Sequence, residues 1–387
     1  MVLYNSLEEY RVCKYCIMDT SDPEIIFDEE GRCSHCKRYF HIAQERILPD
    51  DELKIRLGAL VEKIKNKGRG RKYDCLIGVS GGVDSTYVAY IVKKLGLRPL
   101  AVHLDNGWDS ELAVKNIELT LKKLGIDLFT YVLNWEEFKD LQLSFLKAST
   151  PDLEIPTDQA IIASLFFVAS RNRIKYILLG ENVVTEAIMP KRWSSGQSDW
   201  KYIKNVHKKF GKFKLKRYPY FSFFKRLYYF YLKCHVINIL NYIPYDKNEA
   251  IDILEKEIGW KNYTSKHYES IYTRFVQGYI LPKKFGFDKR RAHLSTLICS
   301  GQMSRERALE EIAKDPYSSG DLKRQDFNYV VKKLGLTEGE FERLLSLPIK
   351  KFDDYPSYAS SSFYRIIRFL ELNKTIKAWV QMFLGRR

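Results

Sequence analysis

Short apolar runs alternate with longer amphipathic stretches along the chain from Tyr73 to about residue 180. The apolar runs predict strands at 75–79, 99–104, 128–133 and 176–180, the first of them buried. Apolar residues at helical spacing predict helices between them, at 85–95, 111–124 and 158–172. Because strands that alternate with helices form parallel sheets covered on both faces, we predict an α/β fold with a doubly wound parallel sheet. Ligands of such sheets bind at the carboxyl ends of the strands.

The pattern differs on both sides of this region. Before it, an apolar stripe predicts one helix at about 41–66, formed by Leu53, Leu57, Leu60, Val61 and Ile64. Beyond residue 245 the spacing is mainly helical, with helices expected at 247–257, 264–278, 289–299, 304–313 and 323–334. We therefore expect an N-terminal segment at 1–66, the α/β domain at 67–190, and a mainly helical domain at 191–387.

Charge is unevenly distributed along the 387 residues. The chain has 64 basic and 48 acidic side chains, a formal excess of +16. Thirteen of the basic residues and one acid lie between Lys191 and Lys233, so most of the excess is local. Such a segment suits nucleic acid, an anionic membrane surface or a phosphorylated substrate. The sequence shows neither a signal peptide nor an apolar run long enough to span a membrane, so we expect a cytoplasmic protein.

A glycine-containing loop follows the first predicted strand and leads into a helix. Its two glycines allow close approach to an anion, and helix N-terminal amides attract phosphate. The alternative interpretation is an ordinary Gly-Gly turn capped by serines. A Gly-Lys-Ser/Thr ending is absent, so the loop is not one that cradles a transferred γ-phosphate. We predict that this loop binds ATP and that Asp84 holds Mg²⁺. The loop is Ser80-Gly81-Gly82-Val83-Asp84-Ser85.

Two Cys-x-x-Cys pairs near the N-terminus are separated by a spacing typical of structural zinc sites. The residues between them suggest a hairpin at 24–31. Four thiolates close the coordination shell of the ion, so the predicted site is structural rather than catalytic; an iron–sulfur cluster is the weaker alternative. The four zinc ligands are Cys13, Cys16, Cys33 and Cys36.

The loop pattern Ser-Gly-Gly-x-Asp-Ser resembles the PP-loop of the ATP pyrophosphatases, which have an adenine nucleotide alpha-hydrolase-like fold. The resemblance implies that a weakly nucleophilic oxygen attacks the α-phosphate of ATP and pyrophosphate leaves. Ammonia or sulfur then attacks the adenylated carbon and AMP leaves. Asp105, at the end of the second strand, lies where this superfamily contacts adenosine; a solvated loop acid is the alternative interpretation.

The cysteines outside the two pairs do not fit a catalytic role. Cys75, Cys234 and Cys299 lie in apolar runs without a nucleophile elbow, and position 2 is Val2 rather than cysteine. No basic neighbour marks a thiol of low pKa, so we interpret all three as buried structural residues. We therefore expect no glutaminase within this chain, and any ammonia would come from a partner.

Several further stretches, spanning roughly 10–345, resemble the N-acetyl sugar amidotransferase family of bacterial surface-polysaccharide biosynthesis. They are 12–20, 105–108, 156–158, 180–182, 266–270, 285–295 and 301–306. The resemblance implies conversion of an acetamido group on a nucleotide-activated or N-acetylated sugar to an acetamidino group, in lipopolysaccharide or O-antigen synthesis. Its ammonia would come from separate glutaminase and cyclase-like subunits. The cofactors implied are ATP, Mg²⁺ and structural Zn²⁺.

The predicted site residues fall into three groups. Those expected at ATP are Ser80, Gly81, Gly82, Val83, Asp84, Ser85, Asp105, Gly180 and Asn182. Those expected at the substrate are His267, Glu269, Lys289, Arg290, Arg291 and His293. Those expected to be catalytic are Asp84, Ser85, Lys289 and Arg290. Arginine and lysine suit a phosphate or carboxylate of the substrate, although the run 288–291 equally suits a solvated surface.

Two other functions remain open at this point. A tRNA-modifying, thiolating PP-loop enzyme would suit the zinc site and the basic segment, but not the lack of reactive cysteines. A non-catalytic scaffold would not need the intact loop. The aromatic and basic segment Tyr218–Pro244 is interpreted as a docking surface for the ammonia-delivering partner or as a membrane-surface helix. Its composition also suits single-stranded RNA, so nucleic acid is not the expected partner but stays an alternative.

Overall fold

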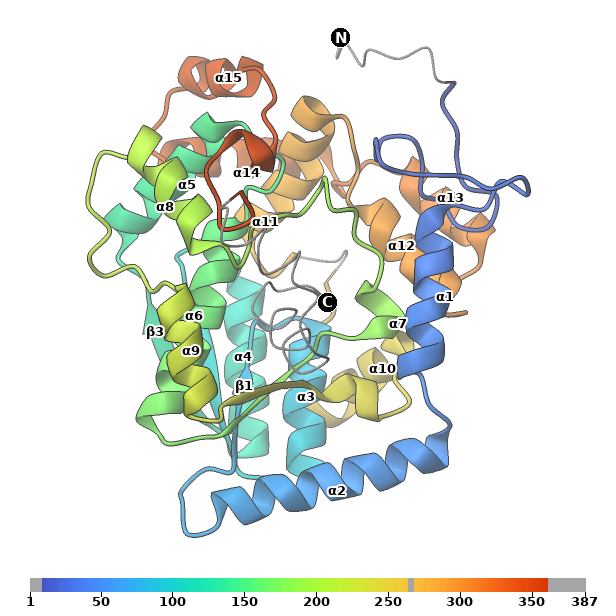
Figure 1. The fold of residues 1–387 in the computed structure, drawn as a ribbon, viewed down its shortest axis with the longest axis vertical. Coiled ribbons are helices and arrows are strands. Elements are labelled where there is room, and N and C mark those ends of the chain that lie inside the picture. Colours follow the sequence, from blue (N-terminus) through green and yellow to red (C-terminus); the bar gives the residue numbers. More distant parts are fainter. Residues whose placement is uncertain (1–8, 264–267, 361–387) are drawn as a thin grey trace.

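The computed structural model describes residues 9–263 and 268–360. Its centre is a five-stranded sheet in which every strand pair is parallel (Figure 1). The strands lie in the order β3-β2-β1-β4-β5. Their bounds are Cys75–Gly78 (β1), Pro99–Asp105 (β2), Asp127–Val132 (β3), Tyr176–Leu179 (β4) and His235–Asn238 (β5). The parallel α/β fold predicted from the alternating pattern is thereby confirmed.

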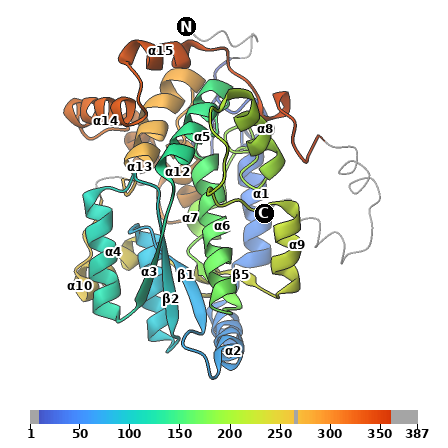
Figure 2. The ribbon, with the colours of Figure 1, turned by 90° about the vertical axis from the view of Figure 1, so that its left-hand side faces the viewer.

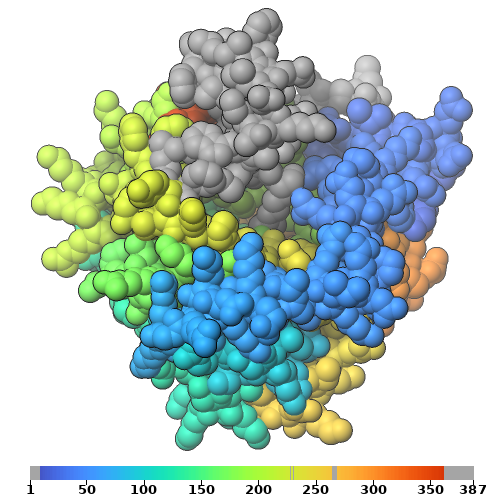
Figure 3. Space-filling view, turned by 60° about the horizontal axis from the view of Figure 1, so that its bottom comes forward, coloured from blue at the N-terminus to red at the C-terminus, as the bar shows by residue number. Residues whose placement is uncertain are grey.

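Helices cover both faces of the sheet (Figure 2). On one face, α2 (Asp50–Gly68), α3 (Val83–Lys94) and α4 (Glu111–Leu124) share an apolar core with β1. On the other face, α6 (Ile155–Arg171) and α9 (Phe223–Tyr231) pack over β1 and β2. The outer surface of α2 crosses the end of the molecule shown in Figure 3. This arrangement is a doubly wound sheet, with the loop after β1 free to meet a ligand at the carboxyl edge.

The strand β5 was not predicted. It consists of four residues at the edge of the sheet, where His235 and Val236 remain exposed, so it lacks the apolar run that marks a buried strand. It pairs with β4 from Tyr176↔His235 to Leu179↔Asn238. The sheet therefore includes residues from both sides of the expected boundary at residue 190.

The remaining helices differ from prediction mainly at their ends. The expected helix at 41–66 is two helices, α1 (Ser34–Arg46) and α2, because Pro49 lies at the N-terminal cap of α2. The expected helix at 264–278 begins, within the described residues, at Ile271, and continues as a π-helix over Val276–Phe285. Three helices appear close to their predicted ranges: α10 (Lys247–Ile258), α12 (Arg290–Cys299) and α13 (Arg305–Ala313).

Several helices were not predicted or have shifted bounds. Those without a predicted counterpart are α5 (Trp135–Ala148), α7 (Val183–Glu186), α8 (Trp200–Phe210) and α15 (Glu338–Ser346), whereas α9 lies within 218–244, where a membrane-surface helix was one interpretation. Two helices have predicted counterparts, at 264–278 and 323–334, but begin at other residues: α11 (Ile271–Phe275) and α14 (Gly320–Lys333). The hairpin expected at 24–31 is reduced to a single antiparallel bridge, Phe27↔Cys33.

The cysteine-bearing N-terminal segment is attached firmly to the C-terminal helices. Arg305 of α13 donates to the backbone carbonyls of Cys16 (3.1 Å) and Cys13 (3.0 Å). The backbone N–H of Ile17 donates to Ser295 Oγ on α12 at 3.2 Å. One apolar cluster includes the four cysteines together with residues of α5, α8, α12 and α15. The N-terminal segment is therefore part of the packing of the C-terminal helices.

Candidate active site

The glycine-containing loop runs from the end of β1 to the first turn of α3 and is held by its own serines. Ser85 Oγ donates to the Gly82 carbonyl at 3.1 Å, and the Ser80 and Ser85 hydroxyls lie 3.1 Å apart. Gly81 has a positive φ of 81°, and a Cβ there would come within 2.7 Å of the Ala113 carbonyl oxygen on α4. Only glycine fits this position, because a side chain would be strained and would also meet backbone.

Two aromatic residues distant in the sequence fix the same loop from outside. Trp260 Nε1 donates to the Gly81 carbonyl at 2.9 Å, and the Tyr263 hydroxyl donates to the same oxygen at 3.1 Å. These two residues hold the Gly81 carbonyl on the outside of the loop. Amide N–H groups of the loop and of the α3 N-terminus can then bind an anion on the inside. Sequence patterns gave no signal for either aromatic residue.

Asp84, in the first turn of α3, is oriented by a buried tyrosine. The Tyr245 hydroxyl donates to Asp84 Oδ1. Burial, and then the Asp84 carboxylate, raise the pKa of Tyr245, so this hydroxyl remains a proton donor. At the end of β4, a Cβ on Gly180 would lie 3.0 Å from the Asp84 backbone, so these two segments touch. A carboxylate fixed beside a phosphate-binding loop fits Mg²⁺, which takes oxygen ligands from protein and phosphate together.

A cavity of about 1230 Å³ opens at the carboxyl edge of the sheet. It is large enough for a nucleotide with a second substrate. Its lining combines the loop with residues of α6, the 191–199 segment and the C-terminal helices. The predicted site residues among them are Ser80, Gly82, Val83, Asp84, Ser85, Gly180, Glu269, Lys289 and His293.

The segment at residue 269 joins the C-terminal part to the loop. The Ser110 N–H donates to the Glu269 carbonyl at 2.8 Å, and Asp109 and Ser270 form an antiparallel bridge. A Cβ on Gly82 would lie 3.5 Å from Glu269 Oε1, which places this carboxylate over the loop. His267, which was predicted beside it, lies outside the described residues.

Four other predicted residues, which do not line the cavity, have structural contacts. Asp105 accepts from the Gly107 N–H at 2.9 Å, and Asn182 caps α7 by accepting from the Thr185 N–H at 2.9 Å. Arg290 binds Asp288 at 2.7 Å. Arg291 binds Asp19 at 2.9 Å and the Ile17 carbonyl at 2.8 Å. The two arginines therefore hold the local fold and the N-terminal segment, and their assignment to the substrate stays a prediction.

Lys289 lies in the cavity wall among carboxylates. Its ammonium binds Glu154 at 3.3 Å, and Gln277 donates to the same carboxylate at 2.8 Å. Burial tends to lower the pKa of Lys289, but Glu154, Asp152 and Asp158 outweigh it and raise that pKa. Burial raises the pKa of Asp152 to about 6. It also raises the pKa of Asp158, with a further contribution from Asp152.

This group of residues is more acidic than the sequence suggested. One ammonium faces three carboxyl groups, those of Asp152, Glu154 and Asp158. We expected Lys289 to hold a phosphate or carboxylate, yet its charge is already balanced by Glu154. The surroundings favour hydroxyl donors and cationic groups instead. We call Glu154, Asp158 and Lys289, which line the cavity, its acidic wall.

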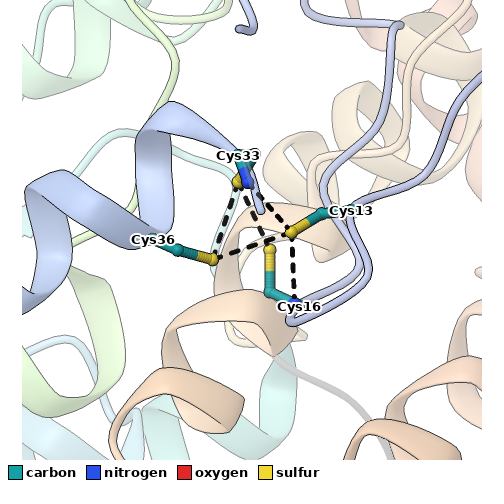
Figure 4. Close-up of side chains that lie close together, drawn as sticks. All are labelled: Cys13, Cys16, Cys33 and Cys36. Atoms are coloured by element: carbon teal, nitrogen blue, oxygen red, sulfur yellow. Dashed lines mark hydrogen bonds between the residues drawn. The ribbon is translucent and has the colours of Figure 1, made fainter. Parts of the chain in front are cut away.

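The four cysteines of the N-terminal segment converge on one buried point (Figure 4). The Sγ atoms lie 3.8 Å apart for Cys13 and Cys36, 3.7 Å for Cys16 and Cys33, and 3.6 Å for Cys33 and Cys36. Tetrahedral zinc with bonds of about 2.3 Å would separate its sulfur ligands by about 3.8 Å. Cys33 N–H also donates to Cys13 Sγ at 3.2 Å, which favours the thiolate. The four residues thus fit a structural zinc ion.

The remaining cysteines differ from one another. Burial raises the pKa of Cys75 and raises that of Cys234 to about 12, so neither is a ready nucleophile. Cys299, on α12, lies with its Sγ 3.8 Å from that of Cys36, beside the four-cysteine cluster. This neighbour was not foreseen, because the two residues are 263 positions apart.

The segment Tyr218–Pro244 divides into a buried and an exposed half. Tyr229 of α9 packs on Phe166 of α6, with ring centroids 5.0 Å apart. On the outer side of α9, Phe224 and Tyr231 are 76% and 82% exposed. None of the helices in the described part of the chain is both long and apolar enough to span a membrane. The docking interpretation stays a prediction, now restricted to the outer side of α9.

Comparisons with known proteins match different parts of the chain. Residues 269–370 match the C-terminal domain family of WbpG-like LPS biosynthesis proteins. An uncharacterized protein of Methanocaldococcus jannaschii is 23% identical over 309 residues, 78% of this chain and 93% of that protein.

Two synthetases are also similar over shorter stretches. The NH(3)-dependent NAD(+) synthetase of Pyrococcus horikoshii is 27% identical over 165 residues, 42% of this chain and 61% of its own length. The glutamine-hydrolyzing GMP synthase of Pyrobaculum aerophilum is 37% identical over 81 residues, 21% of this chain and 15% of its own. This chain spans less than two thirds of either synthetase. It therefore has a WbpG-like C-terminal domain and PP-loop relatives at modest identity.

Proposed function

We propose that this protein is an ATP-dependent, AMP-forming amidotransferase acting on an N-acetylated, nucleotide-activated sugar in lipopolysaccharide biosynthesis. It would convert an acetamido group to an acetamidino group with ammonia from a separate glutaminase. The observation that carries the proposal is a single cavity lined both by the phosphate loop and by residues of the WbpG-like domain, Glu269, Lys289 and His293. The synthetase relatives support ATP-dependent amidation chemistry.

In the first step, the acetamido oxygen attacks the α-phosphorus of ATP and pyrophosphate leaves. The loop amides, with the Ser80 and Ser85 hydroxyls, bind the phosphates where negative charge accumulates. Mg²⁺ held by Asp84 would neutralise charge on the leaving pyrophosphate. Tyr245 fixes the Asp84 carboxylate before ATP arrives, so no reorganisation is needed during the reaction.

The acidic wall suits the other half of this reaction. O-Adenylation places positive charge on the amide nitrogen, and the final amidinium is a cation. The Glu154 carboxylate, in a partly buried cavity, stabilises such charge more than water would. Oxygens of Glu154 and Asp158 also accept hydrogen bonds from sugar hydroxyls. We therefore place the sugar at the acidic wall and the nucleotide at the loop.

In the second step, ammonia adds to the adenylated carbon, and AMP leaves with the former acetamido oxygen. The amidinium keeps three of the four N–H protons that the adenylated amide and ammonia bring, and the fourth passes to the departing AMP phosphate or to solvent. Water must be excluded, because it would return the activated group to the amide. The thiols of buried Cys75 and half-buried Cys234, with raised pKa values, provide no glutaminase or thiolation nucleophile. We accordingly propose separate glutaminase and cyclase-like partners and a cytoplasmic site of action.

The test supplies a panel of nucleotide-activated N-acetyl sugars with ATP, Mg²⁺ and ammonium chloride, which replaces the partners. We expect AMP and pyrophosphate in equal amounts, with a product in which NH replaces one oxygen. Pyrophosphate release with unmodified tRNA, but with none of the sugars, would reject the proposal in favour of a tRNA-modifying enzyme.

A further inference from the structure

A buried histidine lies directly beside the phosphate loop. His103, on β2, is 9% exposed and lines the cavity with Ser80 and Asp109. Its Nδ1 lies 3.0 Å from the carbonyl oxygen of Val79, the residue that precedes the loop. Its Nε2 lies 3.1 Å from a carboxylate oxygen of Asp109. The proposed mechanism above makes no use of this residue.

The two partners of the ring decide its protonation. A carbonyl oxygen can only accept a hydrogen bond, and an ionised carboxylate can only accept as well. A neutral imidazole has one N–H and could satisfy only one of them. Both contacts are satisfied together when both ring nitrogens carry hydrogen. The geometry of Val79 and Asp109 therefore selects the imidazolium form of His103.

Other charges around the ring agree with this form. The acids facing it are Asp109, in the loop before α4, and Asp105, at the end of β2. Burial tends to lower the pKa of His103, but the Asp109 hydrogen bond and charge, the Val79 carbonyl and Asp105 outweigh it, so the pKa is raised. A raised pKa means that the cation persists at pH values where an ordinary histidine is neutral.

We propose that His103 is a phosphate-site cation, kept protonated by Val79 and Asp109, whose charge attracts the triphosphate of ATP and stabilises negative charge as pyrophosphate leaves. The inference rests on the proposed ATP chemistry but does not depend on which substrate is adenylated. If the role of His103 were only structural, the ring would fill space between β1 and the α4 N-terminus. ATP affinity would then not depend on the charge of the ring, whereas the proposal requires that it does.

The first experiment reads the protonation state directly. The chain has seven histidines, so ¹⁵N-histidine labelling gives a small set of imidazole signals, and His103→Gln identifies the one lost. At about pH 6.5 an ordinary histidine is half protonated. We expect His103 to be mainly imidazolium there, with both nitrogens protonated. A neutral-tautomer signal at this pH would overturn the proposal.

The second experiment measures ATP binding as a function of pH, without any sugar. We expect His103→Gln to weaken ATP binding by roughly tenfold, the scale of one charge–charge interaction in a partly buried site. Wild-type affinity should fall as pH rises through the raised pKa of His103. Asp109→Asn should move that fall to lower pH by about one unit, since it removes the neighbouring charge. Because ATP itself changes protonation near neutral pH, the pH profile of His103→Gln is subtracted from that of the wild type, which leaves the contribution of His103.

A second His–Asp pair provides the matched control. His207 on α8 lies 2.9 Å from Asp140 and is buried outside the cavity lining. His207→Gln should lower thermal stability without altering the pH profile of ATP binding. An unshifted profile in Asp109→Asn, or the same loss of ATP affinity in His207→Gln and His103→Gln, would contradict the proposal. Failure of the sugar assay with an intact ATP profile would instead reject only the proposed substrate.

Discussion

The residue Asp84 combines a local signal with a contact that only the fold creates. It follows two glycines at the start of a helix, which is why the sequence alone indicated phosphate binding. Its carboxylate accepts a hydrogen bond from Tyr245, 161 positions away, and no pattern in the chain connects the two. Trp260 and Tyr263 bind the Gly81 carbonyl from even further along the chain. Sequence reasoning thus found the loop but not the residues that hold it.

The first prediction concerns this pair. Asp84→Ala should abolish pyrophosphate release while leaving the circular dichroism spectrum unchanged, because the Mg²⁺ ligand is lost. Tyr245→Phe should reduce kcat by roughly ten- to a hundredfold, the value of a hydrogen bond to a charged group. Tyr87→Phe is the control: its ring lies 5.6 Å from that of Tyr245, and activity should be retained. Wild-type turnover in Asp84→Ala would refute the assignment of the loop.

The second prediction concerns Lys289 and Glu154 in the acidic wall. Lys289→Met should destabilise the protein by about 3 kcal/mol, because it leaves buried carboxylates without their cation. Adding Glu154→Gln should restore much of the stability, since the unpaired charge is removed. Sugar turnover should remain low in the double variant, while ATP binding should persist. Thermal unfolding and steady-state kinetics measure both effects; full sugar turnover in the double variant would show that the acidic wall is only structural.

At the scale of elements, the alternating part of the chain was easier to predict than its flanks. The strands β1, β2, β3 and β4 lie within about one residue of their predicted ranges. β1, β2 and β4 are compact, largely buried runs, whereas most residues of β3 are exposed at the edge of the sheet. The edge strand β5 and the helix α9 lie in the basic and aromatic segment, where tertiary packing on β4 and α6 decides the conformation.

The third prediction concerns the N-terminal segment. The purified protein should contain about one zinc ion per chain, bound by four thiolates. Cys33→Ser should lose most of the metal and lower the melting temperature, because the segment packs on α12 and α13 through Ser295 and Arg305. Cys299→Ser is a close control, since its sulfur lies beside the cluster but outside it. Elemental analysis decides the matter: a metal-free wild type, or full zinc in Cys33→Ser, would disprove the site.

At the scale of the whole molecule, the C-terminal helices complete a site that begins in the sheet. The bridge between Asp109 and Ser270 brings Glu269 over the loop, and α12 contributes His293 to the same cavity. The composition of the chain could not reveal this closure, because it depends on pairing between segments about 160 residues apart. It explains why the predicted substrate residues divide between those lining the cavity and those, such as Arg291, that fasten the N-terminal segment.

One measurement tests the central claim most directly: the products formed from ATP, ammonium chloride and a nucleotide-activated N-acetyl sugar. The proposed function predicts that AMP, pyrophosphate and an acetamidino sugar appear in equal amounts, and that all three are lost in Asp84→Ala. With ammonia omitted, pyrophosphate exchange should continue without amidine, since adenylation precedes ammonia addition. Release of ADP and phosphate, or pyrophosphate release that depends on tRNA and on no sugar, would contradict the account.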